Sequence, residues 1–134
     1  MTFDVWPDWR SRDVVYRDEH LLVVDKPAGV PSQAAEPEHD DDVVARLKRY
    51  LAVERGVAPE EVYLGLHQRL DRGTSGLMCF ALAREMNAGL ARQFEGRTVG
   101  KGYVAAVQGR LPGGGGAPRT LRDLLAKGKG GVMR

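Results

Sequence analysis

Asp71 is the side chain with the clearest capacity for chemistry. It stands between Arg69 and Arg72, and the turn-forming run Gly-Thr-Ser-Gly follows at residues 73–76. Flanking cations favour the ionised carboxylate, and a carboxylate that stays charged can act as a nucleophile or a general base. The structural alternative is a turn residue whose side chain bonds to its own backbone. This segment alone leaves both interpretations open.

Tyr103 is the second candidate, in a segment that reads Lys-Gly-Tyr-Val-Ala-Ala-Val over residues 101–107. A tyrosine in a strand usually packs in a core. Its ring could instead stack on a nucleobase, with its hydroxyl placed for proton transfer. The histidines and Cys79 lack the spacing of metal ligands, so we expect no metal site and interpret Cys79 as a core thiol.

The elements that must position Asp71 follow from periodicity and turn residues. Residues 13–17 and 21–25 predict two strands joined by a turn. The two prolines that come next predict an ordered loop rather than a longer strand. A helix is expected over residues 43–55, with Asp42 as its N-cap and Gly56 just after its end.

The second half of the chain predicts three strands and a helix. The strands are expected over residues 62–66, 76–82 and 102–108, and the helix over residues 84–96. Because residues 76–82 are apolar throughout, we expect both faces of that strand to be covered. Residues 120–127 are long enough for two helical turns. The element order indicates an α+β fold, with a mixed, mainly antiparallel sheet and flanking helices.

Composition indicates one ordinary globular domain. The chain has 134 residues, of which 43% are hydrophobic and 28% are charged. No apolar run approaches the roughly 20 residues that a membrane span needs. The N-terminus lacks the features of a secretory signal, so we expect a cytoplasmic protein. We divide the chain into an extension at residues 1–12, a domain at 13–109 and a Gly-rich basic segment at 110–134.

Charge is unevenly distributed along the chain, although the net charge is only +2. Residues 1–68 carry a net charge of −6, whereas residues 69–110 and residues 111–134 each carry +4. A basic surface around one carboxylate suits a polyanion such as RNA. An ordinary solvated surface would give a similar pattern.

Three separated segments resemble those of one family, the RluA-type pseudouridine synthases. LVVDKPAGV at residues 22–30 resembles the vvdKPaGv segment of the family. RLDRGTSGL at residues 69–77 resembles the central RLDxxTSGL motif, and KGYVAAVQG at residues 101–109 resembles the KxYxAxVxG motif. The resemblance implies an isomerase that converts uridine to pseudouridine in structured RNA, either rRNA or tRNA, without a cofactor.

The resemblance also assigns roles residue by residue. It implies that Asp71 is the catalytic aspartate and that Tyr103 packs against the target base and takes part in proton transfer. The base must leave the helix, because stacking hides its reactive atoms. The residues expected to bind the flipped nucleotide or its phosphates are Arg69, Arg72, Thr74 and Lys101.

The chain departs from the family pattern in two ways. Gln68 stands where the family commonly has histidine. Further strands of the family, and a basic residue that pairs with the catalytic aspartate, have no counterpart here. We therefore expect an incomplete catalytic domain, with a non-catalytic RNA-binding remnant of the same fold as the alternative. A shortened sheet would expose an unpaired edge, which predicts self-association.

Overall fold

The computed structural model divides into two compact units, Met1–Lys101 and Gly102–Arg134. It describes residues 13–34, 41–109, 118, 120 and 122. Within these residues, all helices and strands belong to the first unit. The expected N-terminal extension, most of the C-terminal segment and nearly all of the helix expected at 120–127 lie outside the described residues. No described helix is both long and apolar enough to span a membrane.

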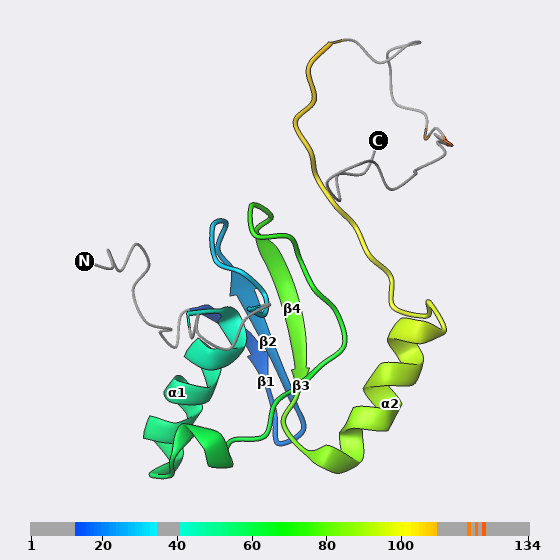
Figure 1. Ribbon diagram of the computed structural model, residues 1–134. Coiled ribbons are helices and arrows are strands. Elements are labelled where there is room, and N and C mark those ends of the chain that lie inside the picture. The colour runs from blue at the N-terminus through cyan, green and yellow to red at the C-terminus, as the bar shows by residue number, and fades with distance from the viewer. Residues whose placement is uncertain (1–12, 35–40, 110–117, 119, 121, 123–134) are drawn as a thin grey trace, which may run out of the picture. The chain divides into compact units, whose positions relative to one another are not determined.

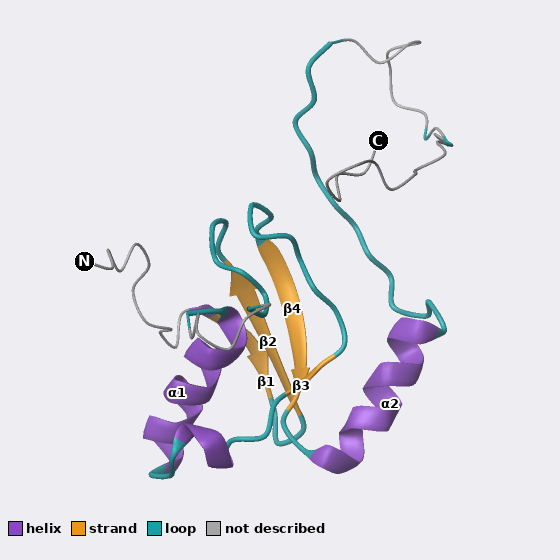
Figure 2. Ribbon diagram, in the orientation of Figure 1, coloured by secondary structure: helices purple, strands orange, loops and turns teal. Residues whose placement is uncertain are grey.

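The first unit is built on a four-stranded sheet in the order β1-β2-β4-β3 (Figures 1 and 2). The central strands are β2 (Leu21–Lys26) and β4 (Gly76–Ala81), which pair antiparallel along their whole length. Strands β1 (Val14–Arg17) and β3 (Gly65–Leu66) form the two edges. The α+β class is confirmed, and the pairings among the described strands are all antiparallel.

Asp18 holds the turn between β1 and β2. Its Oδ1 accepts hydrogen bonds from the backbone nitrogens of His20 and Leu21 at 2.8 and 2.7 Å. The hydroxyl of Tyr16 donates to Oδ2 at 2.7 Å. The tyrosine bond and then the two backbone bonds hold the pKa of Asp18 below its usual value. The predicted sequence of strand, turn and strand is therefore confirmed.

Helix α1 (Val43–Arg55) begins and ends at the predicted residues. Oδ1 of Asp42 accepts a hydrogen bond from the backbone nitrogen of Ala45 at 2.7 Å. This bond satisfies one of the nitrogens that the first helical turn leaves unpaired. Gly56 closes the helix at φ 66°, a left-handed conformation that glycine adopts at little cost.

The hydrophobic core lies between α1 and one face of the sheet. Alternate side chains of a strand point to opposite faces, so Leu22 and Val24 of β2 share a face with Met78 and Phe80 of β4. All four side chains are fully buried. The buried α1 residues in the same hydrophobic cluster are Val43, Leu47, Leu51 and Ala52.

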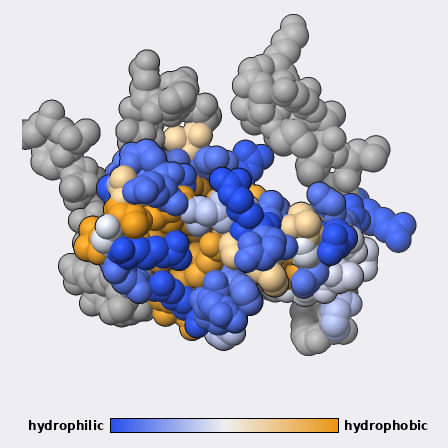
Figure 3. Space-filling model, turned by 90° about the horizontal axis from the view of Figure 1, so that it is seen from below, coloured by the Kyte–Doolittle hydropathy of each residue, from blue (hydrophilic) through white to orange (hydrophobic). Residues whose placement is uncertain are grey.

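The second face of the sheet is only partly covered, so the expectation for residues 76–82 is wrong. Leu77 is 56% exposed, and Cys79 is half-buried instead of lying in the core. Helix α2 (Arg84–Glu95) contacts the sheet at β4, but none of its residues is buried. An apolar run misled the prediction because apolar side chains are common on protein surfaces. Figure 3 shows such hydrophobic patches between hydrophilic residues.

Two other predicted strands are shortened or missing. β3 is confined to Gly65–Leu66, because a 3₁₀ turn over Pro59–Glu61 and three non-strand residues precede it. The strand expected over residues 102–108 does not form. An extended segment becomes a strand only when a neighbour takes its backbone hydrogen bonds, and no described strand pairs with this one.

Candidate active site

The candidate site lies where two loops meet at one end of the sheet. One loop, residues 27–34, follows β2, and the other, residues 67–75, leads into β4 (Figure 1). A cleft of about 520 Å³ is formed by residues of both loops. Its lining consists of Pro31, Ser32, Gln33, Arg69, Leu70, Asp71 and Arg72.

The buried ammonium of Lys26 joins the two loops. Its Nζ donates to the carbonyl oxygens of Val30 at 2.7 Å, Pro27 at 3.0 Å and Arg72 at 3.3 Å. The three donors of the ammonium therefore meet three acceptors, two from the first loop and one from the second. Burial lowers the pKa of Lys26, and the negative charge of Asp71 opposes that shift. Lys26 thus fixes the loops and places a positive charge near Asp71.

Two reciprocal pairs of hydrogen bonds complete the connection between the loops. The nitrogen of Gly29 donates to the carbonyl of Arg72 at 2.6 Å, and Nε of Arg72 donates to the carbonyl of Gly29 at 2.8 Å. The Ser32 hydroxyl donates to the carbonyl of Leu70 at 2.6 Å and accepts from its nitrogen at 2.9 Å. Gly29 has φ 93°, which favours glycine at this contact. The residues on both sides of Asp71 are therefore held in place.

The turn at Asp71 is formed by its backbone, and its side chain takes no part in the turn. Its carbonyl oxygen accepts a hydrogen bond from the nitrogen of Thr74 at 3.0 Å. Its carboxylate is exposed in the cleft and accepts no hydrogen bond from any described residue. Leu70, the residue before it, packs against the hydrophobic core. The turn therefore does not depend on the carboxylate, which supports the chemical interpretation of this residue over the structural one.

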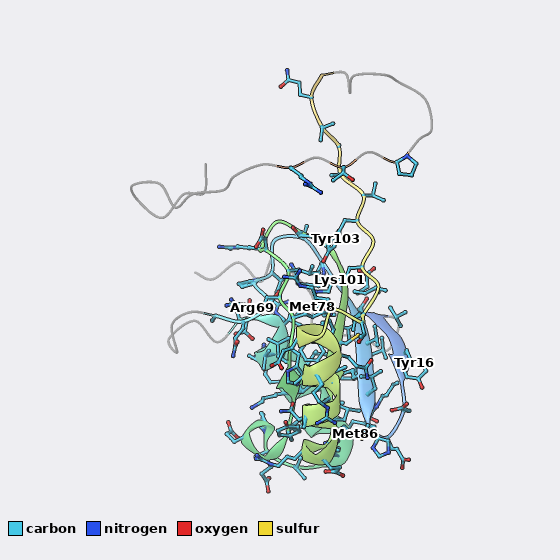
Figure 4. All side chains as sticks on the ribbon, turned by 90° about the vertical axis from the view of Figure 1, so that its right-hand side faces the viewer. Tyr16, Arg69, Met78, Met86, Lys101 and Tyr103 are labelled. Atoms are coloured by element: carbon cyan, nitrogen blue, oxygen red, sulfur yellow. The ribbon has the colours of Figure 1, made fainter. Side chains whose placement is uncertain are left out.

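The structure brings three of the predicted site residues together in the cleft and places Lys101 against α2. Arg69 and Arg72 line the cleft with Asp71, and Thr74 contributes its backbone nitrogen. Lys101 instead lies over the ring of Phe94 in α2, with Nζ 5.2 Å from the ring centroid. Arg69 and Lys101, both labelled in Figure 4, belong to the first unit.

Tyr103 belongs to the second unit, and its place beside the base stays a prediction. Its side chain is 69% exposed. The described residues contain no cluster of three or more His, Cys, Asp or Glu side chains suited to a metal ion. Of the histidines, His67 contacts Oδ1 of Asn87 through Nε2 at 2.7 Å.

Ser32 and Gln33 are site residues that the sequence did not reveal, and Lys26 lies in the motif at residues 22–30 without an expected role. Strand alternation gives a signal for Lys26, because it falls on the same face as Leu22 and Val24 and must point inward. Ser32 and Gln33 give no such signal. The contact between Ser32 and Leu70 joins residues 38 positions apart, which local patterns do not reveal.

We predict that Lys26→Met destabilises the chain by about 2–4 kcal/mol, because it leaves buried carbonyl oxygens without a donor. Urea unfolding measures this loss. Lys48→Met, at a half-buried lysine of α1 that hydrogen-bonds to no described residue, is the matched control and should change stability by less than about 0.5 kcal/mol. Trypsin should also cleave faster after Arg69 and Arg72 in the Lys26 variant. Equal stability and equal cleavage in Lys26→Met and wild type would show that Lys26 does not hold the loops.

Comparison with known proteins shows which family this chain belongs to. The family model described as RNA pseudouridylate synthase matches residues 20–128. The chain is 39% identical over 98 residues to the dual-specificity RNA pseudouridine synthase RluA of Vibrio cholerae. This alignment covers 72% of this chain and 36% of that protein. It is 35% identical over 112 residues to the ribosomal large subunit pseudouridine synthase D of Pseudomonas aeruginosa, covering 81% and 34%.

A solved structure gives the same result. The human RNA Pseudouridylate Synthase Domain Containing 4 matches with a TM-score of 0.53 and 25% identity, over 66% of this chain and 31% of that one. The chain thus spans about a third of the length of these relatives. The family match over most of the sequence confirms what the three motifs predicted: the chain belongs to the RNA pseudouridylate synthase family.

Proposed function

We propose that Asp71 catalyses the isomerisation of uridine to pseudouridine in RNA. The observation that carries this proposal is a carboxylate exposed in a cleft while the residues on both sides of it are fixed by a second loop. A reacting group held in this way loses little freedom on reaching the transition state. The described residues offer no other carboxylate in the cleft lining.

The reaction breaks the bond between N1 of uracil and C1′ of ribose and forms a bond between C5 and C1′. The proton on C5 is lost, and N1 gains one, so no oxidant, reductant or cofactor is needed. Asp71 can attack C1′ or the uracil ring, or assist cleavage of the glycosidic bond. The detached uracil must stay in the cleft while it rotates, which requires a closed site that excludes water.

The substrate that fits this site is a uridine flipped out of structured RNA. The guanidinium of Arg69 has no hydrogen-bond partner among the described residues and can bind a phosphate. Arg72 uses Nε within the loops and keeps its other nitrogens for the RNA. Thr74 and Lys101 are further proposed contacts. We propose rRNA or tRNA as the substrate and the cytoplasm as the location.

A non-catalytic RNA-binding role is the second candidate. Two observations favour it: the chain spans about a third of its relatives, and no described basic side chain hydrogen-bonds to the Asp71 carboxylate. Turnover by the chain itself separates the two candidates, because RNA binding alone releases no proton from C5.

We predict that Asp71→Asn lowers isomerisation at least about a hundredfold, because the amide is neither a nucleophile nor a base. The measurement is tritium release from bulk cellular RNA labelled with [5-³H]uridine in cells that lack the gene. Glu60→Gln, at an exposed carboxylate that does not line the cleft, is the matched control and should keep wild-type activity. Wild-type rates in Asp71→Asn would end the catalytic assignment, and an inactive wild-type chain that binds RNA would favour the second candidate.

For Tyr103→Phe we predict unchanged RNA affinity and slower turnover, because the ring is kept and the hydroxyl is lost. Filter binding gives the affinity, and tritium release gives the rate. Tyr63→Phe controls for the loss of a hydroxyl elsewhere in the chain. Weaker binding with a normal rate would contradict a role in proton transfer.

We also propose that the chain self-associates through the β1 edge of the sheet. No described strand pairs with the outer side of β1, where Val15 and Tyr16 are 56% and 51% exposed; Figure 4 shows Tyr16 on this strand. A charge on an edge strand opposes pairing, so Val15→Lys should lower the mass measured by sedimentation equilibrium. Val53→Lys, 86% exposed on α1, is the control. A monomeric wild-type chain would refute this proposal.

A further inference from the structure

The backbone of Gln33 has a fixed position in the cleft, but its side chain makes no hydrogen bond with a described residue. The hydroxyl of its neighbour Ser32 donates a hydrogen bond to the carbonyl of Leu70 and accepts one from the Leu70 nitrogen. On its other side, the nitrogen of Ala34 donates to Oδ2 of Asp42, the N-cap of α1, at 2.6 Å. Gln33 itself is exposed, and no described residue hydrogen-bonds to its amide. A side chain on such a segment can bind a ligand at a small entropic cost.

The other polar side chains of the cleft cannot both donate a hydrogen bond to a ligand and accept one from it. The Ser32 hydroxyl is already used as both donor and acceptor by Leu70. Arg69 and Arg72 can only donate hydrogen bonds, and an ionised Asp71 can only accept them. Among the described residues that line the cleft, Gln33 therefore has the one side chain that offers both a free donor and a free acceptor.

Uracil presents the complementary pattern on its Watson–Crick edge. Its N3–H is a donor, and the carbonyl oxygens O2 and O4 on either side of it are acceptors. The carbonyl of a glutamine amide can accept from N3–H while its NH₂ group donates to the neighbouring oxygen. Flipped and single-stranded bases are read by hydrogen bonds of this kind.

We propose that Gln33 reads the Watson–Crick edge of the uracil that enters the cleft beside Asp71, and so determines the specificity of the site. This proposal rests on the proposed function, because it takes a flipped uridine as the ligand. Gln33 recognises the base, whereas Asp71 acts on the sugar or the ring. A recognition role predicts a change in base preference, which a purely structural role would not produce.

The test compares two single-stranded probes of about ten nucleotides, a typical binding length. One is oligouridylate, and the other carries 3-methyluridine throughout, which removes the N3–H donor and keeps the phosphates. Fluorescence anisotropy should show that the wild-type chain binds oligouridylate about tenfold tighter, as expected for one bidentate base contact. Gln33→Ala should bind the two probes equally while keeping the wild-type dependence on salt, because its phosphate contacts are intact.

Two further variants complete the design. Gln33→Glu should also lose affinity for oligouridylate, because a carboxylate accepts from N3–H but repels the neighbouring carbonyl. Gln93→Ala, an exposed glutamine of α2, should keep the tenfold preference. Circular dichroism and urea unfolding establish that each variant is folded.

The outcomes separate this proposal from the proposed function. A wild-type chain without a preference, or a Gln33→Ala variant that keeps it, overturns the role of Gln33. Tritium release that depends on Asp71 but not on Gln33 would leave catalysis standing without base reading. A preference that depends on Gln33 in a chain without turnover would support base reading and refute catalysis.

Discussion

The burial of the Lys26 ammonium is the constraint on which the candidate site at one end of the sheet depends. A charged group is costly to remove from water unless partners satisfy all of its donors. Here the partners are carbonyls of two loops that are far apart in sequence, and one of them belongs to Arg72. The loops must therefore adopt one relative position for the lysine to be buried, and that position also sets the backbone around Asp71.

A short series of hydrogen bonds also connects the loop after β2 with α1. One carboxylate oxygen of Asp42 caps the helix, and the other accepts a hydrogen bond from the backbone nitrogen of Ala34, next to the cleft. Ser32 then connects the loop to Leu70, whose side chain packs against the core. The cleft thus shares its supports with the hydrophobic core. The exposed side chains of the cleft, which are Gln33, Arg69, Asp71 and Arg72, stand on a backbone that these contacts hold in place.

The parts of this fold that follow from local signals could be predicted from the sequence. Helix α1 and its two caps depend on the spacing of apolar residues and on Asp42 and Gly56, all within one short segment. The covering of β4 and the strand expected over residues 102–108 depend on distant neighbours, and both predictions were wrong. The motif identified Asp71, but only the folded chain shows that Lys26 and Ser32 hold it and that Gln33 stands beside it.

The distance along the chain between the two loops has a consequence for how the protein folds. Strands β2 and β4 are separated in sequence by all of α1, so their pairing closes a long loop and is slow compared with helix or hairpin formation. A partly folded chain with only α1 and the β1–β2 hairpin has neither the Lys26 contacts nor the cleft. We therefore expect the cleft to be among the last features to form, so that a formed cleft indicates a complete central sheet.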